Sequence, residues 1–180
     1  MTAQIPDRLE YQGQKLSLFT NPLDALPADR KPAFVSESTL NWRGYVALWE
    51  VRDGRLYLKD LRGRICAKPP ESDAPPAKCG RHHRGPCTIE SVDLQGAFPG
   101  RGAPIFADWY TGELKVPQGR LLEYVHMGYA SRYERYLMID VAAGAIVQAR
   151  EIKSDPPSRT PLRSIARWVK SYARRMGSRG

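Results

Sequence analysis

The segment WRGYVALWEVRDGRLYLKDL, residues 42–61, limits the fold of this chain more than any other feature. The Asp-Gly pair at 53–54 accepts the positive φ angles of a two-residue hairpin turn. Both flanks are rich in β-branched and aromatic residues, which favour strands. Tyr45, Ala47 and Trp49 alternate onto one face of the first flank. The segment therefore predicts a β-hairpin with at least one interior face.

Strand-like runs recur on both sides of this hairpin. A second hairpin is predicted over 8–19, and further strands over 103–109, 113–116, 120–127 and 136–152, the last with an Ala-Gly turn. Fifteen glycines and fifteen prolines indicate many turns between short elements. A chain of 180 residues suits one domain. We predict a mainly β (α+β) fold: an antiparallel sheet, a sandwich or a half-open barrel.

The last part of the chain has a helical period. After a break at Asp155-Pro156-Pro157, apolar residues recur at i, i+3, i+4 and i+7 beyond Pro161, with basic residues elsewhere on the helical wheel. We therefore divide the chain into a β-rich domain over 1–152, with a Pro-rich Cys/His insertion at 62–87, and a basic linker and amphipathic helix over 153–180.

The net charge of +9 is concentrated in this tail. Eight of the 28 basic residues follow Ile152, against one of the 19 acidic residues, so the tail carries +7 and the preceding domain only +2. The high isoelectric point therefore says little about what the domain itself binds.

The insertion holds all three cysteines and two of the three histidines. A zinc site would draw its ligands from Cys66, Cys79, His82, His83 and Cys87. Cys66 lies thirteen positions before Cys79, and the segment contains no Cys-x-x-Cys pair. We therefore favour the interpretation of this segment as a Pro-rich surface loop inserted between two strands. A zinc site is the weaker alternative. No cofactor is predicted.

Most of the segments 38–61 and 106–137 resemble a family of small bacterial proteins with no established activity. The resemblance rests on the sequence segments STLNWRGYVALWEV, DGRLYLKDL and FADWYTGELKVPQGRLLEYVHMGY. It transfers no catalytic role. In this family the region after KDL continues without a long cysteine-bearing insert, so the resemblance supports the interpretation of 62–87 as an insertion.

Catalysis is the alternative to a binding role. A hydrolase could use Asp108 or Glu123 as a base with His126 as its partner. If 120–127 is extended, however, Glu123 and His126 point to opposite faces of the strand. Structural hydrogen bonding is therefore favoured for these side chains, and no catalytic residue is predicted.

Aromatic and arginine residues next to turns are the better candidates for a protein-binding surface. They are Trp42, Arg43, Trp109 and Tyr110. The tail offers a second surface, which either packs on the domain or meets a partner groove, an anionic membrane or phosphates through Arg163, Arg167, Trp168, Lys170 and Arg174.

These patterns predict a small interaction or accessory protein, of an immunity- or defence-associated kind by analogy, with a protein partner. Polyanion or membrane-surface binding through the tail is the second alternative after the hydrolase. No stretch reaches the roughly 18 apolar residues of a membrane span. The N-terminus has no signal-peptide pattern, and clustered cysteines agree with a reducing compartment, so we expect a cytoplasmic protein.

Overall fold

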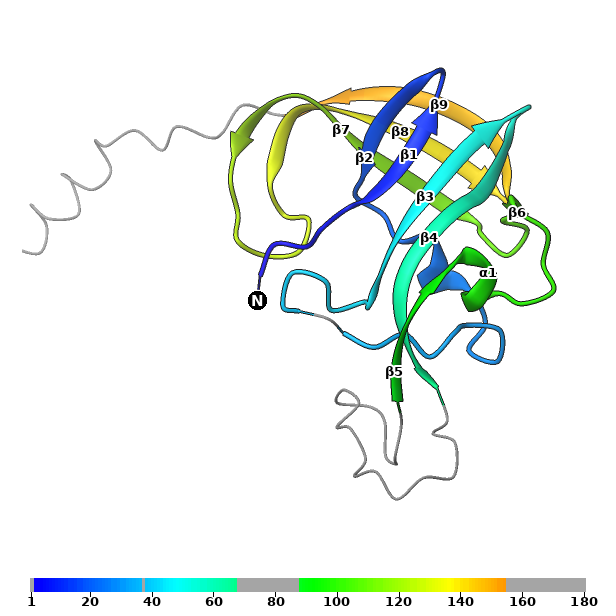
Figure 1. Ribbon diagram of the computed structural model, residues 1–180. Coiled ribbons are helices and arrows are strands. Elements are labelled where there is room, and N and C mark those ends of the chain that lie inside the picture. Colours follow the sequence, from blue (N-terminus) through cyan, green and yellow to red (C-terminus); the bar gives the residue numbers. More distant parts are fainter. Residues whose placement is uncertain (1, 37, 68–87, 155–180) are drawn as a thin grey trace, which may run out of the picture.

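Nine strands and two short helices form the part of the chain that this computed structural model describes, residues 2–36, 38–67 and 88–154. Figure 1 shows their arrangement. The elements are β1 (Asp7–Tyr11), β2 (Gln14–Leu18), the 3-10 helix η1 (Pro22–Ala25), β3 (Tyr45–Arg52), β4 (Arg55–Ala67), β5 (Thr88–Asp93), α1 (Leu94–Ala97), β6 (Ile105–Phe106), β7 (Gly112–Glu123), β8 (Arg132–Ala142) and β9 (Ala145–Lys153).

All nine strands belong to one sheet, in which β2-β1-β3-β4-β9-β8-β7 are neighbours and β5 and β6 also pair with β4. The mainly β class predicted from the sequence is confirmed. The predicted antiparallel sheet is in fact mixed, because β1 runs parallel to β3. A parallel pair requires a long crossover, and here the chain between β2 and β3 supplies it.

The predicted hairpins are present, and their turns explain why. Residues 12–13, 53–54 and 143–144 all have positive φ, and the second residue of each pair is glycine. Two-residue turns of this kind match the right-handed twist of the strands that they join. The turns connect β1 to β2, β3 to β4 and β8 to β9.

Some strands differ from the predicted runs. β4 continues to Ala67, into the segment predicted as an insertion, and there it pairs with β5, which the sequence pattern did not indicate. The runs at 113–116 and 120–127 contribute to one strand, β7, whose register with β8 shifts after Gln118 and again after Leu121. β-Bulges of this kind let a long strand bend.

The sheet curves strongly (Figure 1). Just beyond β2, the Phe19 N–H donates to the carbonyl of Lys115 in β7 at 2.7 Å. The two end strands of the sheet, β2 and β7, therefore approach each other. The sheet is nevertheless not closed, because β4 and β9 share only the pair Arg55–Ala145. The largest fully buried side chains include Trp49, Tyr45, Leu9, Leu18, Leu56, Leu58, Leu114 and Ile139.

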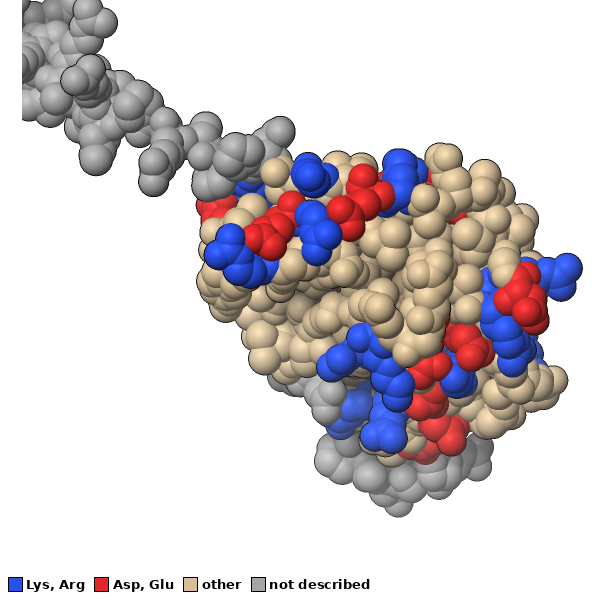
Figure 2. Space-filling view, turned by 90° about the horizontal axis from the view of Figure 1, so that it is seen from above, with Lys and Arg blue, Asp and Glu red and all other residues tan. Residues whose placement is uncertain are grey.

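Acidic and basic side chains lie in bands on the outside of the sheet (Figure 2). In one band, Arg120 pairs with Glu134, Arg135 with Glu151, and Arg150 with Asp140. In another, Lys59 pairs with Glu10 and Glu50. Exposed pairs of this kind each contribute little stability, but they leave these bands nearly neutral.

No helix among the described residues is long and apolar enough to cross a membrane. The C-terminal helix predicted after Pro161 lies outside the described residues.

Candidate protein-binding surface

A buried ion pair lies beside the N-terminal strand. Asp7, the first residue of β1, is fully buried, and its Oδ1 accepts hydrogen bonds from Arg43 Nη1 at 3.0 Å and from the Ala47 N–H at 3.1 Å. Its Oδ2 accepts from Trp49 Nε1 at 3.0 Å. The Arg43 side chain is 6% exposed. Both carboxylate oxygens are therefore satisfied inside the protein.

The geometry indicates that this pair is ionised. Burial raises the pKa of Asp7, while Arg43, Trp49 and Ala47 act against that shift. Burial alone would lower the pKa of Arg43, but Asp7, Tyr129 and Tyr45 together outweigh burial and raise that pKa. A proton on either Asp7 oxygen would face only N–H donors, which cannot accept it. We therefore treat Asp7 as a carboxylate and Arg43 as a cation.

Arg43 extends the network to other segments of the chain. Its Nη2 donates to the Ile5 carbonyl at 2.7 Å, and its Nη1 also donates to Asn21 Oδ1 at 2.6 Å. Tyr129, from the loop between β7 and β8, donates its hydroxyl to the same Asn21 oxygen at 3.0 Å. Burial raises the pKa of Tyr129 to about 12, so it remains a neutral donor. Four distant segments thus meet at one network.

Gln4 joins two of the same loops directly. Its Nε2 donates to the Thr39 carbonyl at 2.7 Å, and its Oε1 accepts from the Trp42 N–H at 3.2 Å. Its backbone N–H donates to the Gly128 carbonyl at 3.1 Å. Because one residue bonds both the loop before β3 and the loop between β7 and β8, these loops and the N-terminal segment form a single surface.

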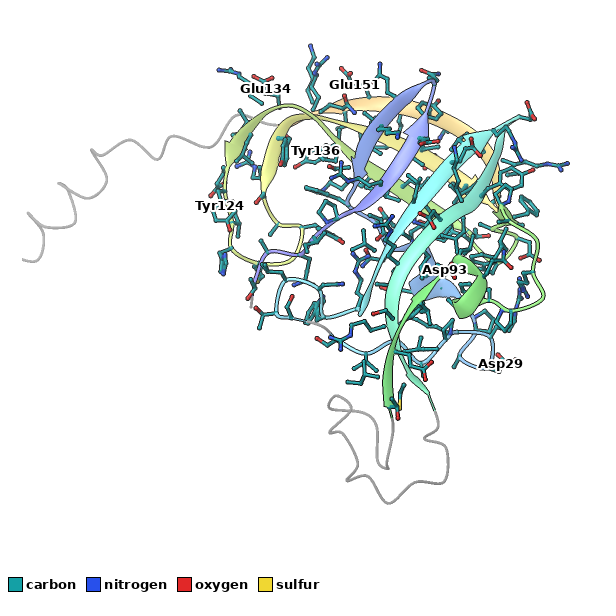
Figure 3. All side chains as sticks on the ribbon, in the orientation of Figure 1. Asp29, Asp93, Tyr124, Glu134, Tyr136 and Glu151 are labelled. Atoms are coloured by element: carbon teal, nitrogen blue, oxygen red, sulfur yellow. The ribbon has the colours of Figure 1, made fainter. Side chains whose placement is uncertain are left out.

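That surface carries large apolar side chains. We define the end surface as Ile5, Leu40, Trp42, Tyr124 and Met127, whose exposed fractions are 42%, 46%, 58%, 62% and 45%. The three segments that carry them lie at the same side of the molecule in Figure 1. Tyr124 points away from the body just beyond β7 (Figure 3), and its hydroxyl is 2.9 Å from His126 Nδ1.

The four residues predicted as a turn-associated binding surface have different environments. Trp42 is exposed and belongs to the end surface, whereas Arg43 is held inside by Asp7. Tyr110 is 5% exposed, and its hydroxyl donates to the Glu113 carbonyl. Trp109 packs beside Trp49 at a ring separation of 6.5 Å. Only Trp42 thus presents a largely exposed side chain to a partner, because the other three are used in internal contacts.

The structure does not gather the alternative catalytic residues. Asp108 precedes β7 and lies 3.8 Å from Arg30, whereas Glu123 ends β7 and pairs with Arg132 at 3.3 Å. His126 follows in the next loop and contacts Tyr124 instead. Because Asp108 and Glu123 lie at opposite ends of a twelve-residue strand, they share no catalytic centre.

Of the five possible zinc ligands, only Cys66 is among the described residues, and it is disulfide-bonded. A disulfide sulfur does not serve as the thiolate ligand that zinc requires. Cys79, His82, His83 and Cys87 lie outside the described residues. Within the described ranges, no group of three or more His, Cys, Asp or Glu side chains could hold a metal ion.

The basic residues predicted to bind anionic partners, Arg163, Arg167, Lys170 and Arg174, lie outside the described residues together with Trp168.

Comparisons with protein-family models, with curated proteins and with solved structures gave no match.

Proposed function

We propose that this chain is a small protein-binding module and that its end surface is the docking site for a partner protein. The observation that carries the proposal is the gathering of Ile5, Leu40, Trp42, Tyr124 and Met127, each at least 42% exposed, on one side of the molecule. Single exposed apolar residues are ordinary on protein surfaces, but a gathered set is typical of interaction sites.

The chemistry of the end surface favours an apolar protein partner. Trp, Tyr and Met are enriched in protein–protein interfaces, and charged residues are depleted from interface centres. Nearby charges are neutralised, since Glu123 pairs with Arg132 and Arg43 is buried against Asp7. A partner would therefore gain more from burying apolar area, at about 25 cal/mol per Å², than from charge complementarity.

The surface is also held in place before any partner arrives. Gln4 links the loops, and the Asp7–Arg43 network fixes the strand and loop backbones behind them. A preorganised surface loses less conformational entropy on binding. More specifically, we propose an immunity- or defence-associated role. Identification of the partner protein tests this role.

Site-specific photo-crosslinking tests the location of the docking site. A photoreactive phenylalanine analogue at position 42 is expected to crosslink one specific protein in cells that naturally express the chain. The same analogue at Val147, which is 65% exposed on β9, is the control. The crosslinked protein is then purified separately and must bind the unmodified chain in solution. Equal crosslinking from positions 42 and 147, or no binding by the purified protein, would contradict the proposal.

A further inference from the structure

β5 forms an open edge of the sheet. It pairs with β4 on one side, and no strand of the described residues pairs with its other side. All six of its residues are exposed or half-buried. In Figure 1 β5 lies at the lower end of the molecule, where it leads into α1. An open edge of this kind can pair with a strand of another chain.

The hydrogen bonds of β4 show which backbone groups of β5 point outward. The Arg64 N–H donates to the Gly44 carbonyl at 2.9 Å, and the Arg64 carbonyl accepts the Val35 N–H at 2.8 Å. Both groups of Arg64 therefore point away from Ser91, which lies opposite it in β5. Because the two residues of such a pair both direct their backbone groups outward, the N–H and C=O of Ser91 point away from β4. Those of Ile89, two residues earlier, do the same, and no group of the described residues bonds to them.

One face of the sheet beside this edge carries two arginines. Arg62 lies opposite Asp93, and Arg64 lies opposite Ser91, so all four residues share a face. They also line one hollow of about 720 Å³. Within residues 2–36, 38–67 and 88–154, neither arginine forms an ion pair, in contrast to the paired bands elsewhere on the sheet. Asp93 instead caps α1, where its Oδ1 accepts the Gly96 N–H at 2.9 Å. This face therefore favours an acidic partner.

We propose that an extended, acidic segment of a partner protein adds to β5 as a further strand. Its backbone bonds to the outward N–H and C=O groups of Ile89 and Ser91, as in other cases of strand addition. Its carboxylates bind Arg62 and Arg64 on the shared face. Two strand spacings of about 4.8 Å separate β4 from the added strand, and an arginine and a glutamate side chain together span that gap. The small side chain of Ser91 leaves space between them.

Two peptides of opposite charge and of the length of β5 test the location of the site. One peptide alternates threonine with glutamate, and the other alternates threonine with lysine. Each is titrated into the isotopically labelled full chain and followed by NMR at low salt. The glutamate peptide should bind at least about tenfold more tightly, because opposite charges on neighbouring strands attract and like charges repel. Its largest amide shift changes should occur at Ile89 and Ser91.

A proline at position 91 tests the backbone contacts. Ser91→Pro removes an outward N–H but no hydrogen bond between β4 and β5, and edge strands tolerate proline where the N–H faces solvent. It should weaken binding of the glutamate peptide about fivefold or more, the effect of losing one hydrogen bond. Ser91→Ala keeps the N–H, so it should bind like the unmodified chain. Circular dichroism checks that both variants fold.

A second pair of variants tests the charge preference. Arg62→Ala with Arg64→Ala should abolish the preference for the glutamate peptide, whereas Arg52→Ala with Arg55→Ala, an equal change of charge near the β3–β4 turn, should retain it.

The comparison of the two peptides uses the unmodified chain, so it decides the proposal even where a variant fails to fold. Equal affinities of the two peptides, or shift changes that leave the β5 amides unaffected, would overturn the proposal. Equal binding by folded Ser91→Pro and Ser91→Ala would also overturn it. Shifts of the Ile89 and Ser91 amides that grow with protein concentration in the absence of peptide would identify a second copy of the chain as the occupant, against the proposed acidic partner.

Discussion

Replacing Asp7 with alanine is expected to lower the free energy of unfolding by about 3–5 kcal/mol, because removing one partner of a buried ion pair leaves the other charge uncompensated. Arg43 would remain largely buried, and the Ala47 N–H and Trp49 Nε1 would lose their acceptor. The measurement is equilibrium unfolding in urea, followed by tryptophan fluorescence. A loss below about 1 kcal/mol would show that the network is not what holds these segments together.

A double-mutant cycle with Arg43→Ala isolates the pair. Because the two side chains are 3.0 Å apart and share the network, the double variant should be much more stable than the sum of the single losses implies. The matched control is Glu123→Ala, which breaks an exposed pair with Arg132. That loss should stay below about 1 kcal/mol.

Gly44→Ala is expected to cost roughly 3 kcal/mol or more, since it adds overpacking to backbone strain. Gly44 has a φ of +78°, and an added Cβ would lie 2.3 Å from the Val35 carbonyl oxygen. The neighbour is backbone, so it cannot rotate away. The clash would displace the loop that carries Trp42. Thermal and urea unfolding measure this cost.

Gly54→Ala is the matched control for Gly44→Ala. Gly54 also has positive φ, at +69°, but an added Cβ would meet no atom within 4 Å. This variant should lose only about 1 kcal/mol, the cost of the backbone conformation alone. Similar losses at both positions would show that the close approach of Val35 does not matter.

The sequence predicted the elements whose cause is local. The turns at 53–54 and 143–144 are set by their own residues. Alternation along β3 placed Tyr45, Ala47 and Trp49 on one face, and the structure shows that this face is buried. β5 was missed because its residues, Thr88 to Asp93, are mostly polar and show no strand-like pattern of their own. It forms a strand because it pairs with β4. Tertiary pairing supplied what the local pattern lacked.

The candidate surface was predicted only in part, for a similar reason. Trp42 and Trp109 both lie near turns, yet only Trp42 is largely exposed, because Trp109 packs against Trp49 and donates to the Pro22 carbonyl. Nothing local to Asp7 or Gln4 distinguishes them from other polar residues near the start of the chain. Their roles depend on partners 35 or more residues away, and one sequence does not reveal those pairings.

The affinity of the crosslinked partner for Trp42→Ser tests the central claim most directly. Trp42 is 58% exposed, so the substitution should leave folding nearly unchanged. As an exposed aromatic residue of the proposed docking site, it should nevertheless contribute strongly to binding, and its loss should raise the Kd about tenfold or more. Val147→Ser, also at an exposed apolar residue, should bind like the unmodified chain. A Trp42→Ser protein that folds normally and binds the partner with unchanged affinity would contradict the assignment of the end surface as the docking site.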